Sequence, residues 1–217
     1  MKIGIVGTGN MGRTLGVQWA RAGHEVLFGS RDDAKAKAAA LAASPSARSG
    51  DFDAAAAFGE VILYTLRGVP PSRALREPRV LASKVVIDCN NSDFDPSRPG
   101  EFFAAPVPSF AEQLASDAPG ARVVQAFSTV PHRIIELGRE RLQPRRISVF
   151  LCADDAAAKA TVKRLAEDIG FVGVDSGELR RARLVDGVVD FIRFQIAALG
   201  RGPLTTISLD GLSEVAS

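Results

Sequence analysis

Residues 1–12 read Met-Lys-Ile-Gly-Ile-Val-Gly-Thr-Gly-Asn-Met-Gly, and this stretch decides the fold. A short apolar run over 3–6 meets the pattern Gly7-x-Gly9-x-x-Gly12, and a helical pattern follows. In that context the first glycine permits a tight turn, the second lets the backbone approach a pyrophosphate, and the third lets the helix pack closely on the strand. Amide groups at the helix N-terminus then face the phosphates. We therefore expect a dinucleotide here, bound by Gly7, Thr8, Gly9, Asn10, Met11 and Gly12.

The residues after the second predicted strand, Glu25–Phe28, indicate which dinucleotide is bound. NAD-binding proteins usually place a carboxylate there, which accepts a hydrogen bond from the ribose 2′-hydroxyl. Here Ser30 and Arg31 follow the strand, and both side chains can donate hydrogen bonds to a 2′-phosphate. Lys35 can add a third donor, while the two aspartates at 32 and 33 suit a helix N-terminus. This chemistry favours NADP over NAD, with a solvated surface charge as the alternative for Arg31.

The composition is that of an ordinary globular protein. The chain has 217 residues, enough for one substantial core or a domain with a small appendage. Its net charge of only +2 gives no reason to expect a nucleic-acid or membrane partner. No segment approaches the ~20 apolar residues of a membrane span. Cys89 and Cys152 lack metal-ligand or disulfide spacing, so we expect reduced thiols, no metal site and a cytoplasmic protein.

The order of the elements predicts an α/β fold: a doubly wound, mostly parallel Rossmann sheet with a small C-terminal α/β and helical extension. The strand-like runs are continuously apolar, as expected when helices cover both faces of a sheet. We predict strands at Lys2–Val6, Glu25–Phe28, Val61–Thr65, Val85–Cys89, Arg122–Ala126, Ser148–Cys152 and Val172–Val174. We predict helices at Met11–Ala22, Asp33–Ala42, Phe52–Ala57, Ser72–Ala82, Phe110–Ser116, Arg133–Arg141, Ala156–Ile169 and Leu179–Ala198. We expect an NADP-binding domain over 1–145 and a small C-terminal portion over 146–217, packed on the first or on a dimer partner.

The chain also resembles a known family. Gly-Thr-Gly-Asn-Met-Gly at 7–12 and Gly-Ser-Arg at 29–31, with Lys35 after them, are similar to the NADPH-dependent reductases of the deazaflavin coenzyme F-420. The similarity continues in Ala-Phe-Ser-Thr-Val-Pro at 126–131 and Asp-Ser-Gly at 175–177, so it covers nearly the whole chain. The resemblance implies hydride exchange between NADP(H) and a deazaflavin or similar acceptor, commonly in a homodimer.

Two departures from that family concern the acceptor. Asn90, Asn91 and Ser92 follow a strand where many relatives have Asn-Pro, and Ser128 stands where relatives tend to carry Asn or His. Both changes fall where the nicotinamide and the second substrate should meet. Coenzyme F-420, a flavin, a quinone or a metal chelate therefore remains open as the small-molecule acceptor.

Hydride transfer between planar rings requires stacking at about 3–3.5 Å and exclusion of water rather than a catalytic triad. Ser128 and Thr129 can hydrogen-bond a carboxamide or an acceptor carbonyl. His132 could relay the accompanying proton, because histidine titrates near neutral pH; its alternative is a solvent-facing residue at a helix start. These three are the candidate catalytic residues. The candidate cofactor-binding residues outside the glycine loop are Ser30, Arg31, Lys35, Thr65, Leu66, Arg67 and Asn90.

Three further features allow two interpretations each. The helical pattern over 179–198 is too apolar for one wet face, so it packs across the core or against a second subunit. A basic cluster at Arg180, Arg181 and Arg183 could receive an acidic tail of the acceptor or form a solvated helix start. Phe102 and Phe103 could cover a cofactor or simply pack their loop.

Two other functions compete with the reductase. One is reduction of a small imine or carbonyl, as pyrroline-5-carboxylate reductases do with a similar glycine pattern. The other is a sensor in which NADPH binding only changes the affinity for a partner. The first alternative is disfavoured, because those enzymes follow the Rossmann domain with a helical dimerisation domain, whereas strand-like segments continue here to Val174. Fold alone does not exclude the sensor.

Overall fold

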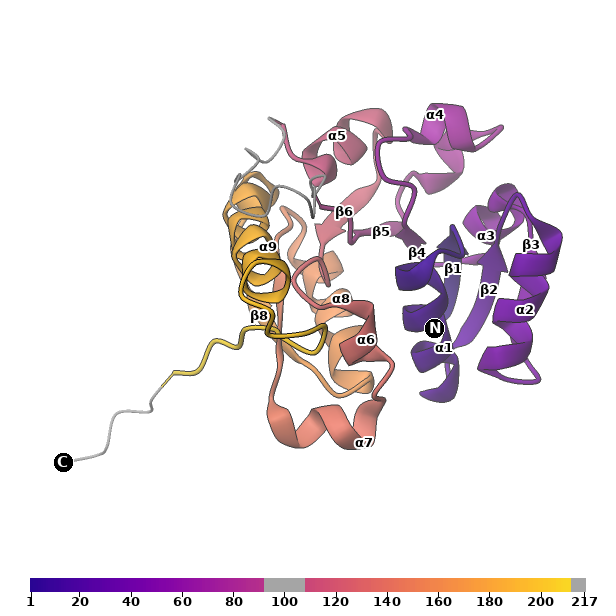
Figure 1. The fold of residues 1–217 in the computed structure, drawn as a ribbon. Helices are drawn as coiled ribbons and strands as arrows, with labels where there is room; N and C mark the ends of the chain where they lie inside the picture. Colours follow the sequence, from indigo (N-terminus) through magenta and orange to yellow (C-terminus); the bar gives the residue numbers. More distant parts are fainter. Residues whose placement is uncertain (92–107, 212–217) are drawn as a thin grey trace.

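The structure, a computed structural model, describes residues 1–91 and 108–211 (Figure 1). A sheet of six parallel strands has the order β3-β2-β1-β4-β5-β6, which is the order of the doubly wound dinucleotide-binding fold. The predicted α/β fold is therefore confirmed. The strands are β1 Lys2–Val6, β2 Glu25–Gly29, β3 Arg48–Gly50, β4 Val61–Tyr64, β5 Val85–Asp88 and β6 Arg122–Gln125.

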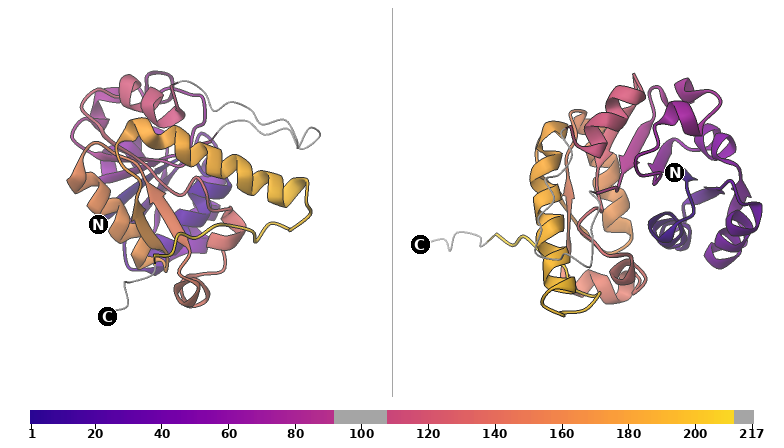
Figure 2. Two further views of the ribbon diagram at one scale, coloured as in Figure 1. Left: turned by 90° about the vertical axis from the view of Figure 1, so that its left-hand side faces the viewer. Right: turned by 45° about the horizontal axis from the view of Figure 1, so that its top comes forward.

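A second, two-stranded sheet continues the first. It consists of β7 (Ser148–Leu151) and β8 (Val172–Asp175), which are parallel. An antiparallel bridge joins it to β6, because Gln125 and Cys152 exchange backbone hydrogen bonds of 2.9 and 3.1 Å. In the right-hand view of Figure 2 this C-terminal part and the strands around β1 stand on opposite sides of the molecule. The division into two domains at residue 145 remains a prediction.

The helices follow the predicted positions except at two places. Pro78 interrupts the predicted helix over 72–82, since proline donates no hydrogen bond and disfavours a helical residue before it; a short helix and a 3-10 turn replace it. Gly138, with φ +78°, divides the predicted helix over 133–141. The helices are α1 Asn10–Arg21, α2 Asp33–Ala43, α3 Phe52–Phe58, α4 Pro71–Ala74, α5 Phe110–Asp117, α6 His132–Ile135, α7 Arg139–Leu142, α8 Ala156–Asp168 and α9 Ala182–Ala197, with 3-10 turns at Pro78–Leu81, Gln143–Arg145 and Leu179–Arg181.

An aromatic cluster connects the N-terminal and C-terminal parts of the chain. Trp19 of α1 is fully buried, and its indole Nε1 donates to the carbonyl of Leu165 in α8 at 3.0 Å. Its ring meets Phe127 edge to face at 5.8 Å between centroids, and Phe127 meets Phe171 in the same way at 6.3 Å. Such aromatic pairs stabilise a core by about 0.5–1.5 kcal/mol beyond their buried area. The cluster therefore fixes α1 against α8.

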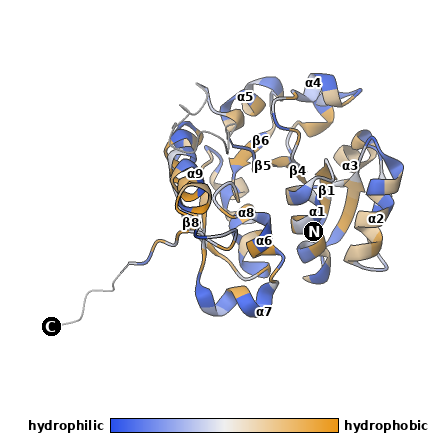
Figure 3. Cartoon of the chain, viewed as in Figure 1, coloured by the Kyte–Doolittle hydropathy of each residue, from blue (hydrophilic) through white to orange (hydrophobic). Residues whose placement is uncertain are grey.

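The strands consist mainly of hydrophobic residues (Figure 3), and these residues and the apolar residues of the inner helix faces are buried. Cys89 and Cys152 are both buried and free. The last helix, α9, buries the side made by Val185, Val189 and Ile192, yet Leu184 and Phe191 stay 68% and 49% exposed. Within the described ranges, no helix combines the length and the apolar character needed to cross a membrane.

Candidate functional site

The glycine loop between β1 and α1 is shaped by two packed glycines and one open glycine. Gly7 has φ +107°, and a Cβ there would lie 2.3 Å from Thr65 Oγ1. A Cβ on Gly12 would lie 1.9 Å from the carbonyl oxygen of Gly7. A Cβ on Gly9 would meet nothing within 4 Å. The first and third glycines are therefore required by packing, whereas the second faces open space.

The N-terminus of α1 is prepared for an anion. Gly9 is its N-cap residue and provides no side-chain oxygen, so the amides of the first turn have no capping hydroxyl or carboxylate. Thr65 supports the loop from the next strand, because its hydroxyl lies 3.1 Å from the carbonyl oxygens of both Val6 and Gly7. A pyrophosphate suits such a helix start, which combines exposed N–H groups with the positive end of the helix dipole. These residues fit a dinucleotide.

The residues predicted to select NADP lie at the neighbouring strand end. The amide of Gly7 donates to the carbonyl of Gly29 at 3.1 Å, so the end of β2 adjoins the glycine loop. Ser30 and the exposed Arg31 follow β2 directly. Asp32 caps α2 as expected: it accepts from the amide of Lys35 at 3.2 Å, and the Lys35 ammonium lies 3.7 Å from its carboxylate. Ser30, Arg31 and Lys35 are thus grouped at one edge, and their contact with a 2′-phosphate remains a prediction.

A pocket of about 590 Å³ opens beside the start of α1. Its volume is typical of small-molecule sites, which span roughly 300–1,000 Å³. Four loops that follow β1, β4, β5 and β6 meet one face of α9 around it. Nine of the predicted site residues line this pocket: Gly9, Asn10, Met11, Thr65, Arg67, Asn90, Ser128, Thr129 and His132.

The other predicted site residues lie outside this lining. Leu66 lines a separate cavity of about 50 Å³ together with Tyr64 and Asp88. Phe102, Phe103 and Ser92 lie outside the described residues. Within the described ranges, no group of three or more histidine, cysteine or acidic residues is placed to hold a metal ion.

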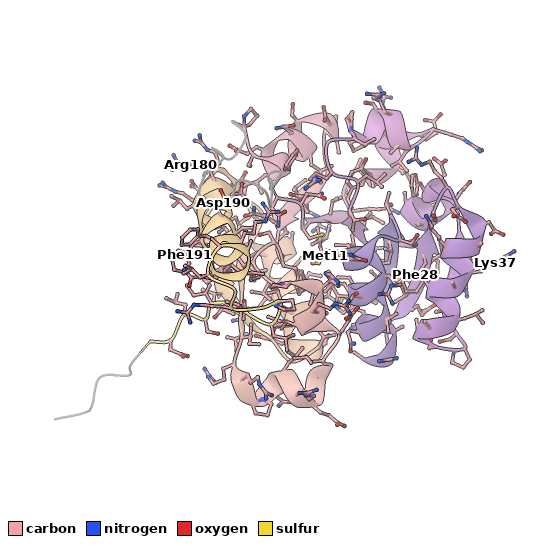
Figure 4. The ribbon with its side chains drawn as sticks, viewed as in Figure 1. Met11, Phe28, Lys37, Arg180, Asp190 and Phe191 are labelled. Atoms are coloured by element: carbon pink, nitrogen blue, oxygen red, sulfur yellow. The ribbon has the colours of Figure 1, made fainter. Side chains whose placement is uncertain are left out.

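The α9 wall of the pocket was not predicted from the sequence. Val189, Ile192, Arg193 and Ile196 face the pocket from α9, opposite the α1 residues that begin at Asn10. Figure 4 shows Met11 on α1 and Asp190 on α9. The spacing of these four residues places them on one helix face, but that pattern also indicates ordinary core packing.

Two asparagines after β5 connect the loops around the pocket. Asn90 Nδ2 donates to the carbonyl of Tyr64 at 3.2 Å and to Asp88 Oδ1 at 2.6 Å. Asn91 Nδ2 donates to the carbonyl of Ser128 at 3.1 Å, and Asn91 Oδ1 accepts from Arg193. The segment that departs from the resembled family therefore ties β4, β6 and α9 together.

The segment after β6 contains a constrained turn with two unpaired hydroxyls. Phe127 has φ +64°, a conformation that costs a bulky residue of order 1–3 kcal/mol. The hydroxyl oxygens of Ser128 and Thr129 are covered by protein and have no hydrogen-bond partner among the described residues. Burying an unpaired hydroxyl costs about 1–3 kcal/mol. Polar groups of this kind, in the wall of a pocket, are available for a ligand once their side chains rotate.

Burial controls ionisation around the site. Burial raises the pKa of Asp88 to about 7, although hydrogen bonds from Asn90 act in the opposite direction. Burial also raises the pKa of Asp186 to about 6, with Gln125 Nε2 donating to it at 2.8 Å. The pKa of the Cys89 thiol is raised well above its usual range for the same reason. Cys89 in the pocket wall is therefore a protonated thiol and a poor nucleophile at neutral pH.

Comparisons with known sequences identify similar proteins. Residues 2–92 match a family model described as "NADP oxidoreductase coenzyme F420-dependent". The chain is 30% identical over 190 residues to Metalloreductase STEAP3 of Rattus norvegicus, an alignment that covers 86% of this chain and 36% of that protein. The chain thus spans little more than a third of the length of the curated relatives it matches.

Solved structures share the fold. A protein assigned as an F-420-dependent NADP reductase from Arthrobacter sp. FB24 has a TM-score of 0.78 and 26% identity, covering 97% of this chain and 100% of that one. An imine reductase from Aspergillus terreus in complex with NADPH4 has a TM-score of 0.58 and 20% identity, covering 85% of this chain and 58% of that one. The predicted family resemblance and fold are confirmed, and the family match supports the predicted use of NADP.

Proposed function

We propose that this chain is an NADP-dependent oxidoreductase that transfers hydride between NADP(H) and a small planar acceptor. Residues 2–92 match the model of the coenzyme F-420-dependent NADP oxidoreductases, and this match supports the proposal. The observation that carries this proposal is the shared pocket. The start of α1 supplies one wall and α9 the other, so about 590 Å³ lies beside the dinucleotide loop. A second ring can enter there beside the first.

The residues of the chain divide into groups with separate tasks. NADPH, when bound, supplies the hydride. The amides that follow Gly9 hold the pyrophosphate, Ser30 and Arg31 hold the 2′-phosphate, and Arg67 contacts the ribose or a phosphate. Thr65 fixes the glycine loop through its two backbone contacts. This side of the site therefore binds and orients the dinucleotide.

The opposite side receives the acceptor. Val189, Ile192 and Ile196 give the pocket an apolar wall that excludes water from the reacting rings. Ser128 and Thr129 offer hydroxyls to the nicotinamide carboxamide or to a carbonyl of the acceptor. His132, at the first position of α6 and in the pocket lining, delivers the proton that accompanies the hydride.

Coenzyme F-420, a flavin or a quinone can accept the hydride directly, whereas a ferric chelate takes single electrons, so that one dihydroflavin formed in the hydride step would reduce two ferric ions. The acceptor belongs to the group of coenzyme F-420, a flavin, a quinone or a metal chelate. The assignments of the structural relative as an F-420-dependent reductase and of the sequence relatives as metalloreductases support the first and the last of these. Imine reductases share only the fold at this level of identity. Reduction of a small imine and a role as an NADPH sensor are the competing outcomes of the test.

The test follows oxidation of NADPH by absorbance with each acceptor in turn: F-420, FMN, a naphthoquinone, ferric citrate together with FMN, and a cyclic imine. We expect turnover with at least one redox acceptor, and His132→Asn should slow it by about 10²-fold, a typical contribution of general acid catalysis. His24→Asn is the matched control, because His24 lies outside the pocket lining and hydrogen-bonds Asp168 at 3.1 Å. Tight NADPH binding without any turnover would replace the reductase by the sensor.

We also propose a homodimer and a cytoplasmic location. A homodimer would cover the exposed Leu184 and Phe191 of α9, so Leu184→Glu should convert a dimer to a monomer in sedimentation. A cytoplasmic location suits two free thiols, and cell fractionation tests it. A wild-type monomer, or protein found only in an oxidising compartment, would contradict the respective proposal.

A further inference from the structure

The α9 wall of the pocket combines an apolar surface with one cationic group. Val189, Ile192 and Ile196 are apolar, and Arg193 lies among them in the pocket lining. The Arg193 side chain is only 18% exposed. A charged side chain that is mostly desolvated in an apolar wall is costly unless it is paired, so its position calls for an explanation.

Arg193 is held in place by residues of the site itself. Its guanidinium donates to Asn91 Oδ1 and lies 3.6 Å from the Asp190 carboxylate. Asn91 in turn donates to the carbonyl of Ser128 at 3.1 Å. A guanidinium oriented in this way is planar and permanently charged, and it matches the oxygens of a phosphate or carboxylate.

The charges around the pocket favour an anion. Among its described lining residues, the charged ones are Arg67 and Arg193, and none is acidic. Arg67 follows β4 on the side of the dinucleotide loop, whereas Arg193 comes from the opposite wall. Two carboxyls pack near Arg193: Asp190, its ion-pair partner, and Asp186, which is buried and hydrogen-bonded to Gln125. Neither belongs to the pocket lining, so an entering ligand meets the guanidinium first.

We propose that Arg193 is the acceptor-specificity residue of this enzyme and selects planar acceptors that carry a phosphate or carboxylate over neutral ones of the same ring chemistry. This inference rests on the proposed function, since it concerns the acceptor half of the same pocket. It narrows the acceptor from any planar redox compound to an anionic one. Neutral quinones are then the poorest substrates of the group.

Riboflavin and FMN provide a matched pair of probes, because they share one ring system and differ by a phosphate. In each turnover the flavin gains a hydride and one proton, and NADPH becomes NADP⁺. The wild-type protein should have a kcat/KM for FMN about tenfold higher than its kcat/KM for riboflavin. The difference should come from a lower KM for FMN at equal kcat, because the phosphate is remote from the reacting ring. Arg193→Gln should remove this preference and leave the KM for NADPH unchanged.

Three further variants separate recognition from folding. Arg193→Lys keeps the charge and should retain part of the FMN preference. Asp190→Asn removes the counter-charge and should increase it by severalfold. Arg201→Gln, the matched control, removes an exposed arginine beyond α9 and should change nothing.

The outcomes are distinguishable. The role of Arg193 is overturned if both flavins are turned over and the ratio of kcat/KM for FMN to kcat/KM for riboflavin is the same in wild type, Arg193→Gln and Asp190→Asn. That result leaves the proposed function intact. Absence of turnover with every acceptor, while NADPH still binds, overturns the proposed function instead. If Arg193→Gln fails to fold, the opposite changes expected of Arg193→Lys and Asp190→Asn decide the question, and a constant ratio in both refutes the proposal.

Discussion

Replacing Gly9 by alanine tests the assignment of the glycine loop without disturbing the protein core. A Cβ at this position meets no protein atom within 4 Å, and Gly9 has φ −67°, which alanine adopts readily. Alanine is a poorer N-cap than glycine, which destabilises the folded protein by about 0.5–1 kcal/mol. It also restricts the conformations of the unfolded chain, which stabilises the fold by a similar amount. We therefore expect the unfolding free energy to change by less than about 1 kcal/mol.

Binding should respond very differently, because the added methyl group occupies the open space through which the pyrophosphate approaches the amides of α1. Loss of that approach should lower the affinity for NADPH by about tenfold or more in calorimetric titration, which is the equivalent of one charge-assisted hydrogen bond. Gly12→Ala is the contrasting variant. Its Cβ would lie 1.9 Å from the Gly7 carbonyl oxygen, so it should destabilise the fold by about 1–3 kcal/mol. Wild-type NADPH affinity in a fully folded Gly9→Ala variant would refute the assignment.

Three other predictions follow from named contacts. Arg31→Ala should weaken NADPH binding by about 10–100-fold and NADH binding very little. Lys37→Ala in the helix α2 that follows Arg31 should affect neither, because Lys37 is paired with Asp33 at 2.6 Å; equal losses for both nucleotides in titration of Arg31→Ala would contradict the 2′-phosphate assignment. The folded-state pKa of Asp88 lies above its ordinary value, so the unfolding free energy should fall as pH rises from about 4 to about 7. Urea titrations at several pH values should show that Asp88→Asn removes a few kcal/mol of this fall. An unchanged dependence of the unfolding free energy on pH in Asp88→Asn would count against the raised pKa. Trp19→Phe leaves the buried Leu165 carbonyl without its 3.0 Å donor and should cost about 1–3 kcal/mol in denaturant unfolding, so an unchanged midpoint would show that the contact contributes nothing.

The parts of the fold that follow from local pattern were predictable. Continuous apolar runs such as Val85–Asp88 and the glycine loop fix the order strand, turn and helix, and the structure has strands where these runs occur. The edge strand β3, Arg48–Gly50, was missed because it has three residues and no apolar signal. The predicted helix over 72–82 was wrong because Pro78 breaks it, although the alanine and arginine residues of this stretch favour a helix.

The same reasoning explains which half of the site could be predicted. Local sequence indicates the loops that follow strands, because the carboxyl ends of parallel strands meet at one edge of the sheet. The pocket residues of this kind lie at 65–67, 90 and 128–132. The α9 wall depends on tertiary packing between segments distant in the chain, such as the contact of Arg193 with Asn91. An arginine within an apolar stripe was the available signal. It reads equally well as a solvated side chain until the fold places it in the pocket.

Isotope transfer tests the central claim most directly. NADPH carrying deuterium at the reactive carbon of the nicotinamide is mixed with the protein and a 5-deazaflavin, whose reduced ring retains the transferred hydrogen in a stable C–H bond. If the chain transfers hydride between the two rings, mass spectrometry should find the reduced deazaflavin heavier by one deuterium when one of the two stereospecifically labelled forms is used. Reduced deazaflavin without label from either form, or no reduced deazaflavin while NADPH remains bound, would contradict direct hydride transfer.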